Sequence, residues 1–514
     1  MKIVRHILAI AGRSVFIGLS IQIVLGVLWM CCAFTEVQQF GESEFYIEAS
    51  KSLLCDEYTG ALYPVLLMLT RGVEDLLPIP YTYIMYLVQL GVALFAGCRF
   101  LGTLGCSNCP SVLLGKAAER SGGANAKDAD EYRATKEEGI GVRRNAGKKM
   151  LYKVWGSLAL LTFPMTMQCH MAILPNSLAS SCFLLEMAYI MKTIRGKEAF
   201  QAADVAKACT GWLLAALLLP EYLYLGAVPL ILFFLYDVVH GCFRREQKRI
   251  RSVCYHGILI AAFAGMIVGA NSLTQVEGCC GRPQKSVSAA LFRRVAWSSL
   301  QDYYDIWPQD MKDCFTMEEV SSIAAYADNM ERLLQPRLEA ELGVDRANEI
   351  YQELGRVIWK NNTAGILHQT AWDAVGYTLP PVTVQLFLTG RGYDSYVGRN
   401  YDIMRQEAPR LTDYYMDYSC WWFTVGLGIL AVMALGDMAD FIGKKKKSQS
   451  MVVALFPMVI CAASAGCMVI RYTLQGAGMW DYKNALFVGQ LWLSGMLVLA
   501  ERNVYGAYFT KKSK

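Results

Sequence analysis

The chain has 514 residues, of which 54% are hydrophobic and only 18% are charged. Soluble proteins usually carry about 25% charged residues, so the composition argues against an ordinary soluble domain. The net charge of +5 is too small to indicate a nucleic-acid partner. Long apolar runs alternate with short charged patches, and this pattern predicts helices that cross a membrane.

The apolar segments are about ten in number and approach the length that spans a bilayer. They lie at 14–34, 80–100, 152–172, 173–192, 206–220, 222–240, 253–272, 420–437, 451–470 and 484–500. The first is too long for a signal-peptide core and lacks a small-residue cleavage site, so we interpret it as a retained span. The predicted fold class is all-α: a polytopic transmembrane helical bundle with a small, mainly helical extracytoplasmic domain.

The lysines and arginines between the spans set the predicted orientation. When the N-terminus is cytoplasmic, every strongly basic short segment falls on the cytoplasmic side; these segments are 101–150, 192–197, 243–251, 444–447 and 511–514. The sequence therefore predicts a multi-pass protein of the cell membrane with both termini in the cytoplasm. The loop 101–150 is rich in Gly, Ala and charge, which is typical of a flexible linker.

Three regions follow from this topology. Residues 1–272 form an N-terminal transmembrane region that includes an acidic first outer loop at 35–79, and 420–514 form a C-terminal one. The polar insert 273–419 between them has apolar residues at helical spacing, and Thr316 followed by Glu319 is a candidate capping box. We expect a small helical domain on the extracytoplasmic side.

Acidic residues concentrate in the first outer loop, where Glu42, Glu44, Asp56 and Glu57 lie within a short stretch. Carboxylates at an outer membrane face serve as catalytic bases, bind a metal, or simply solvate the loop. No metal ligand and no cofactor is assigned from this pattern, although a divalent cation is compatible with it.

Polar residues also interrupt the central spans. His170 and Asn176 fall at the outer end of a pair of spans, and Glu186 lies within the second one. An ionisable group at membrane depth indicates a functional site, and the alternative is a buried structural partner of a neighbouring helix. Glu221 and Tyr222 follow the break at Pro220; the proline explains the break, but the glutamate is not needed for it.

Two arginines complete the candidate set. Arg471 ends a predicted span on the outer side, and Arg391 lies shortly before another span. The guanidinium group of either arginine could bind a lipid phosphate through two parallel hydrogen bonds. The alternative for Arg471 is that its side chain extends to the lipid headgroups without a specific ligand. No P-loop, metalloprotease motif or nucleophile elbow occurs in the sequence.

The order of these features resembles the GT-C superfamily of polytopic glycosyltransferases, which includes protein O-mannosyltransferases and enzymes that glycosylate lipid A. The resemblance covers about residues 10–240 and rests on the acidic outer loop with its Tyr-Pro step at 63–64, the LPNS turn at 174–177 and the PEYL turn at 220–223. It implies transfer of a sugar from a polyprenyl-phosphate donor on the outer face, with a first-loop carboxylate as catalytic base.

The resemblance leaves the identity of the base open. Asp56-Glu57 is a literal Asp-Glu pair close to the Tyr-Pro step, whereas Glu42 and Glu44 precede a segment similar to the family's acidic-then-Tyr-Ala stretch. Leu219 stands where the family has an arginine before Pro-Glu. His170, Asn176, Glu221 and Tyr222 would bind sugar or acceptor, and Arg391 or Arg471 would stabilise the departing lipid phosphate.

We therefore expect a cell-envelope membrane glycosyltransferase whose partners are a polyprenyl-phosphate-linked sugar, membrane lipid and an acceptor of unknown kind. A transporter or flippase for lipid-linked glycans is the first alternative, in which Glu186 and Asp237 would line a continuous cavity. A non-catalytic assembly protein that binds a partner through 273–419 is the second.

Overall fold

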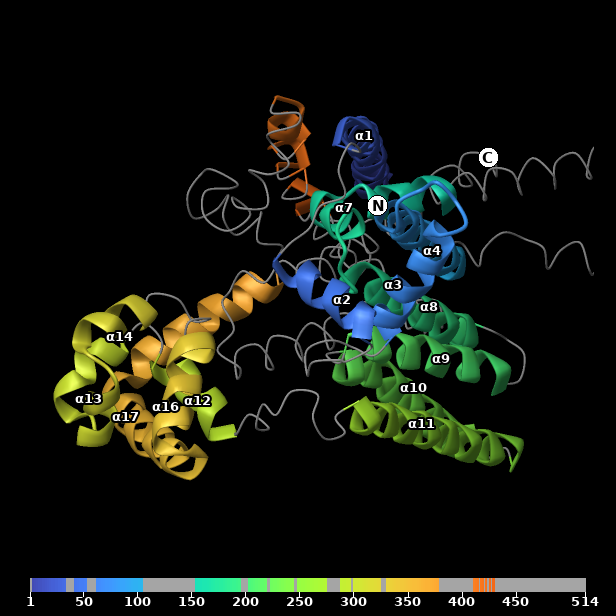
Figure 1. Ribbon diagram of the computed structural model, residues 1–514. Helices are drawn as coiled ribbons and strands as arrows, with labels where there is room; N and C mark the ends of the chain where they lie inside the picture. The colour runs from blue at the N-terminus through green and yellow to red at the C-terminus, as the bar shows by residue number, and fades with distance from the viewer. Residues whose placement is uncertain are drawn as a thin grey trace, which may run out of the picture.

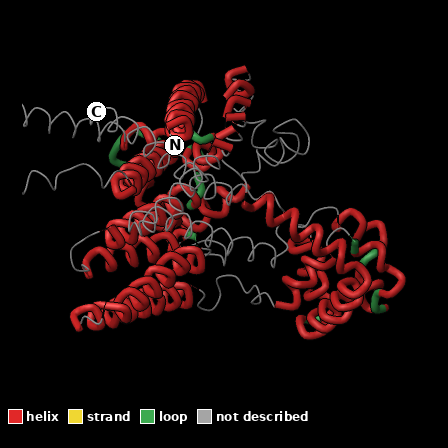
Figure 2. Tube along the Cα trace, turned by 180° about the vertical axis from the view of Figure 1, so that it is seen from behind, coloured by secondary structure: helices red, strands yellow, loops and turns green. Residues whose placement is uncertain are grey.

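The computed structural model describes most of the first 378 residues and a short segment near 420. The described ranges are 2–33, 41–52, 62–104, 153–195, 202–219, 222–244, 247–274, 287–296, 299–324, 330–378 and parts of 410–429. Within these ranges the regular elements are helices and no β-strand occurs, as Figure 2 shows. The all-α prediction is confirmed for the described residues; the linker 105–150 and the spans at 451–470 and 484–500 lie outside them.

A helical bundle is built from the first half of the chain (Figure 1). Its helices are α1 (Lys2–Ala33), α2 (Gly41–Ser52), α3 (Leu62–Glu74), α4 (Tyr81–Leu104), a helix at 153–161, α7 (Pro164–His170), α8 (Asn176–Arg195), α9 (Ala202–Leu218), α10 (Tyr222–Arg244) and α11 (Gln247–Thr274). Helix α8 is central, because α4, α9 and α10 all pack against it. Its residues from Asn176 to Leu184 are all buried.

The predicted span at 152–172 is not one continuous helix. The helix at 153–161 ends before Thr162, and α7 begins at Pro164 after Phe163, whose backbone is extended (φ −66°, ψ 130°). Proline favours the first turn of a helix, where its missing N–H is not needed, and restricts the residue before it to extended backbone. The apolar segment 152–172 is therefore divided into two helices, and Pro164 is the physical reason; that the segment forms one span stays a prediction.

Beside its apolar core, the bundle buries several polar side chains and exposes many large apolar ones, which is unusual for a soluble protein. The buried polar residues include Gln22, Gln89, Ser157, Thr166, His170, Asn176, Ser177 and Glu186. Large apolar side chains face outward on four helices: Ile17, Val24 and Leu28 on α1, Leu87 and Phe95 on α4, Ile231 and Leu235 on α10, and Ile258 and Val268 on α11. Such extensive apolar exposure indicates helices that face lipid.

Helix length gives the same indication for part of the bundle. Among the described residues, Arg13–Cys32 and Tyr81–Thr103 are long and apolar enough to cross a membrane, with mean hydropathies of 2.3 and 1.8. Shorter apolar stretches occur at Leu225–Tyr236 and Val253–Gly269. The number of spans and the position of the termini stay predictions.

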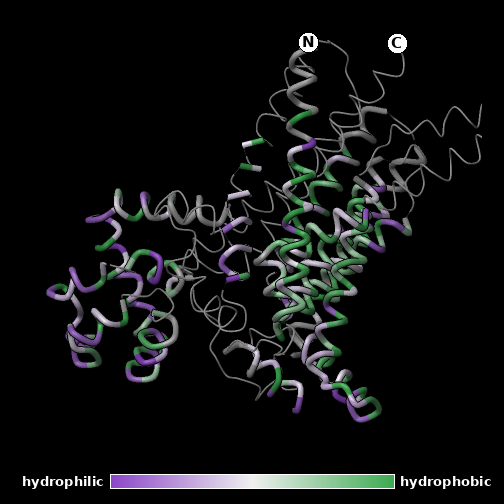
Figure 3. The backbone as a smooth tube through the Cα atoms, turned by 90° about the horizontal axis from the view of Figure 1, so that it is seen from above, coloured by the Kyte–Doolittle hydropathy of each residue, from purple (hydrophilic) through white to green (hydrophobic). Residues whose placement is uncertain are grey.

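A separate helical lobe follows α11 and contains more hydrophilic residues than the bundle (Figure 3). It comprises α12 (Val287–Ala296), the 3-10 helix η1 (Leu300–Ile306), α13 (Gln309–Cys314), α14 (Met317–Ala324), the π-helix η2 (Met330–Leu334), α16 (Gln335–Leu342) and α17 (Val344–Thr378). Its own apolar core includes Phe292, Met311, Leu338, Ile350 and Tyr351. The described part of this insert is helical, as predicted.

The capping box at the start of α14 is also confirmed. The backbone N–H of Thr316 donates to Glu319 Oε2 at 2.9 Å, and the N–H of Glu319 donates to Thr316 Oγ1 at 3.3 Å. These reciprocal bonds satisfy two of the backbone donors that a helix N-terminus leaves without intrahelical partners.

Candidate functional site

A buried hydrogen-bond network joins the first outer loop to the turn before α8. The hydroxyl of Tyr63, on α3, donates to Gln89 Oε1 of α4 at 3.0 Å. Gln89 Nε2 donates to the backbone carbonyls of His170 and Ala172, at 2.9 Å each. One acceptor and two donors of the Gln89 amide are thus used, which fixes the orientation of that amide.

Burial makes this network costly to disrupt. Tyr63 and His170 are completely buried, and Gln89 and Ala172 are 1% exposed. A polar group in such a place costs about 1–3 kcal/mol when it loses its partner, because water cannot replace the lost bond. Gln89 therefore holds the chain from His170 to Ala172, which we call the His170 turn, against α4 and α3.

Helix α2 connects to the same network through aromatic packing. The rings of Tyr46 and Tyr63 meet edge to face, with centroids 5.2 Å apart and an interplanar angle of 82°. Helix α2 buries Ser43, Tyr46, Ala49 and Ser50, a helical spacing that turns one face inward. Glu42 and Glu44 lie on the first turn of α2, so their backbone is carried by a helix anchored beside Tyr63.

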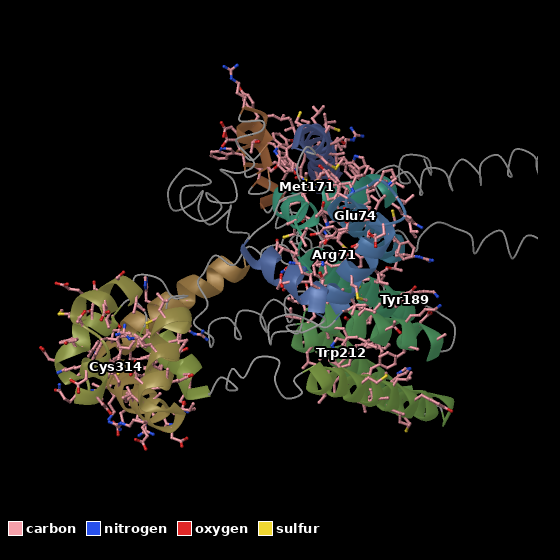
Figure 4. All side chains as sticks on the ribbon, viewed as in Figure 1. Arg71, Glu74, Met171, Tyr189, Trp212 and Cys314 are labelled. Atoms are coloured by element: carbon pink, nitrogen blue, oxygen red, sulfur yellow. The ribbon has the colours of Figure 1, made fainter. Side chains whose placement is uncertain are left out.

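Arg71 adds a second link between α3 and its neighbours. Its guanidinium donates to the carbonyl of Ile47 on α2 at 3.4 Å and lies 4.8 Å above the ring of Tyr81 at the start of α4. Figure 4 shows Arg71 between these elements. Helices α2 and α3, which are the described parts of the segment 35–79, are thus packed onto the bundle.

The His170 side chain lies over the start of α8. Its Nδ1 is hydrogen-bonded to Ser177 Oγ, and its Nε2 has no hydrogen-bond partner among the described residues. The Ser177 carbonyl accepts bonds from the hydroxyls of Ser180 and Ser181. Asn176 is buried beside Ser177 as the first residue of α8. Nε2 is therefore a buried polar atom whose hydrogen bond the described residues do not supply.

Tyr222 is buried at the start of α10, and its ring contacts Phe183 on α8 with centroids 5.9 Å apart. Asn176 and Tyr222, which were both predicted to bind substrate, are thus the first residues of α8 and α10. The remaining predicted residues, Asp56, Glu57, Glu221, Arg391 and Arg471, lie outside the described residues. For Glu42 and Glu44 only the helix that carries them is described.

Sequence inspection did not select Gln89, Tyr46, Ser177 or the hydroxyl of Tyr63. A signal for Gln89 was present, since it is the one side-chain amide in the apolar run from 81 to 104. A polar side chain within a membrane helix often bonds to a neighbouring helix. Among the described residues, no group of three His, Cys, Asp or Glu side chains could hold a metal ion.

The fold and the distribution of polar and apolar residues define a helical membrane protein with a polar network inside the bundle. No family model and no curated protein matches the chain. Among solved structures, the crystal structure of ArnT from Cupriavidus metallidurans in the apo state is similar at 12% identity, over 96% of this chain and 77% of that chain. The TM-score is 0.28, a value too low to show a common fold.

Proposed function

We propose that this protein is a membrane glycosyltransferase that moves a sugar from a polyprenyl-phosphate donor to an acceptor hydroxyl on the extracytoplasmic face. One observation carries the proposal: Tyr46, Tyr63 and Gln89 join α2, with its Glu42 and Glu44, to the His170 turn. Helix α2 and the His170 turn thus belong to one packed unit, an arrangement that supports the proposal because the sequence resemblance to GT-C enzymes leads us to expect it.

The reaction follows from the residue types. A first-loop carboxylate, from Glu42 or Glu44 or from the Asp56-Glu57 pair, takes the proton of the acceptor hydroxyl. The hydroxyl oxygen attacks the anomeric carbon, and the bond from that carbon to the lipid phosphate oxygen breaks, so the electron pair leaves with the phosphate. Arg391 or Arg471 stabilises the phosphate, and His170, Asn176, Glu221 and Tyr222 position sugar or acceptor.

The test uses the full chain in liposomes. Radiolabelled polyprenyl-phosphate mannose, glucose and galactose would be supplied as donors with a membrane lipid extract as acceptor. Transfer should fall strongly in Glu44→Gln or Asp56→Asn, whichever removes the base, and in Arg471→Ala. The matching variants Glu42→Gln, Glu57→Gln and Arg391→Ala cover the remaining candidates, and full activity in all six variants would rule out this mechanism. An EDTA arm tests whether a divalent cation is needed.

The same liposomes separate the alternatives. A flippase would move the intact donor across the bilayer without breaking the sugar–phosphate bond, whereas a transferase would release polyprenyl phosphate. An assembly protein would do neither.

A further inference from the structure

Glu186 is an acidic side chain enclosed in the middle of the bundle and distinct from the Gln89 network. It lies in the middle of α8 and is completely buried. Neither of its carboxylate oxygens has a hydrogen-bond partner among the described residues. A buried polar group usually has such a partner, and an exception requires an explanation.

Glycines face Glu186 from two neighbouring helices. A methyl group at Gly211 of α9 would lie 3.1 Å from Glu186 Cβ, and one at Gly226 of α10 would lie 2.9 Å from Glu186 Oε2. The Gly226 methyl would also lie 2.3 Å from Trp212 Cδ1. We call Gly211, Gly226 and Trp212 the glycine notch; Figure 4 labels Trp212 between α9 and α10. The absent side chains let both helices approach the carboxyl group closely.

The donors nearest to the notch are already engaged. Trp212 Nε1 donates to the carbonyl of Leu223 at 3.0 Å, and this bond ties α9 to α10. On the α8–α9 hairpin, Lys192 pairs with Asp204 at 2.9 Å and Lys207 lies 5.7 Å above the ring of Tyr189. The Cys209 thiol of α9 interacts electrostatically with Glu186, and Cys182 lies one turn earlier on α8. None of these groups supplies a compensating positive charge.

The free-energy cost of burying a charge decides whether the Glu186 side chain is ionised or neutral. An ionised carboxylate without a partner in an apolar interior is far more costly than the neutral acid, and such groups take up a proton instead. Purely structural packing would be served better by Leu or Met, which bury no polar atom. The carboxyl group is therefore a feature of the bundle that packing alone does not explain.

We propose that Glu186 is a proton-binding site, held as a neutral carboxylic acid between α8, α9 and α10, and that its proton exchanges only when α9 and α10 separate at the glycine notch. The packed state holds the proton, and the separated state exposes a hydrated carboxylate. This step is independent of sugar transfer at the outer face, so the bundle has a proton-dependent conformational change whether or not it is a glycosyltransferase.

Infrared spectroscopy of the full chain in phosphatidylcholine vesicles tests the protonation state. At neutral pH the exposed carboxyl groups are ionised, so a carbonyl band of a protonated acid should be present in the wild type and absent in Glu186→Gln. After transfer to heavy water this band should shift slowly, because exchange awaits helix separation. Absence of the band in the wild type would overturn the proposal, and so would a shift complete on mixing.

Two variants of the same type test the notch itself. Gly226→Ala should force α10 away from Glu186 and Trp212 and speed the shift in heavy water roughly tenfold, whereas Gly91→Ala on α4 meets no neighbouring atom within 4 Å and should leave the rate unchanged. An equal rate in both variants would contradict the role of the notch.

A hydrophobic carbodiimide labels the protonated carboxyl group. A carboxyl oxygen bonds to the central carbon of the carbodiimide while the acid proton moves to a carbodiimide nitrogen. Mass spectrometry should locate this adduct at Glu186, with loss of the infrared band, so the assignment stands even if Glu186→Gln does not fold.

Discussion

The hydroxyl of Tyr63 donates a 3.0 Å hydrogen bond to Gln89 Oε1, and the same amide donates to two carbonyls of the His170 turn. Gln89 is therefore shared between a helix of the first outer loop and a turn 81 residues further along the chain. The consequence is that neither segment can shift without breaking bonds that are buried.

Gln89→Leu is the direct test of this sharing. The substitution replaces the amide by an apolar side chain of similar size and leaves the Tyr63 hydroxyl and the His170 carbonyl without the bonds they make to Gln89. The Ala172 carbonyl still accepts the backbone N–H of Leu174 at 3.0 Å. We expect a loss of about 2–4 kcal/mol in the free energy of unfolding, since each orphaned group costs about 1–3 kcal/mol and the site can relax in part. Unfolding of the protein in detergent, followed by circular dichroism, measures it.

Tyr63→Phe provides the partner for a double-mutant cycle. On its own it removes the donor and should cost about 1 kcal/mol. In the double variant the two losses should not add, because Gln89 and Tyr63 share one bond. Additive losses would show that the two side chains act independently, against the hydrogen bond described here.

Close approach of helices gives a second prediction, on α4. A methyl at Gly97 would lie 2.4 Å from Ser157 Oγ and 3.3 Å from Ser157 Cα, so Gly97→Ala must push the helix at 153–161 away. We expect a loss of about 1–3 kcal/mol, the usual cost of overpacking. Thermal unfolding in one detergent compares the variant with the wild type.

Gly91 on the same helix is the matched control, because nothing lies within 4 Å of a methyl placed there. Gly91→Ala should be neutral, or stabilise by about 0.4–1 kcal/mol by restricting the unfolded chain. If both alanine variants behaved alike, close packing of α4 on the helix at 153–161 would not be what Gly97 provides.

Sequence patterns predicted the parts of this fold that depend on local chemistry. The helices α1, α4 and α8 to α11 were predicted from runs of apolar residues, because a membrane helix needs about 20 of them. The capping box follows from Thr316 and Glu319 at their spacing. The exact break at Thr162 and Phe163 did not follow from the sequence, because a proline can either begin a helix or kink one, and the sequence does not decide between these outcomes.

The network around Gln89 could not be derived in the same way. Its bonds join Tyr63, Gln89 and His170, which are separated by 26 and 81 residues in sequence. Such pairs depend on which helices pack together, and hydropathy does not specify neighbours. His170 and Glu186, in contrast, could be selected, because a titratable residue in an apolar segment is unusual wherever it packs.

Helix α14 in the lobe gives a third prediction. Thr316→Ala removes the hydroxyl that accepts the N–H of Glu319, so the first turn of α14 should open more easily. The usual loss for a cap of this type is about 1 kcal/mol. Hydrogen exchange of the full chain should show faster exchange in peptides from Met317–Ala324 and little change in α17. Unchanged exchange in α14 would show that the capping box does not stabilise this helix.

Asp310 of α13 gives the lobe a dependence on pH. Arg346 Nε donates to Asp310 Oδ2 at 2.6 Å, and this bond holds the pKa of Asp310 below its ordinary value of 3.8. A carboxyl group whose pKa is lowered by folding stabilises the folded state above its unfolded pKa, and this contribution is lost as the pH falls through the lowered value. Protection of α13 and α17 should therefore be constant from neutral pH to about pH 4 and should fall below that. The drop should be small because both side chains are partly exposed to solvent.

Asp310→Asn tests this assignment. When both proteins are compared by hydrogen exchange at the same pH, the variant should show weaker protection near neutral pH and a smaller decrease in acid. An identical acid profile in the two proteins would mean that another carboxyl group controls it.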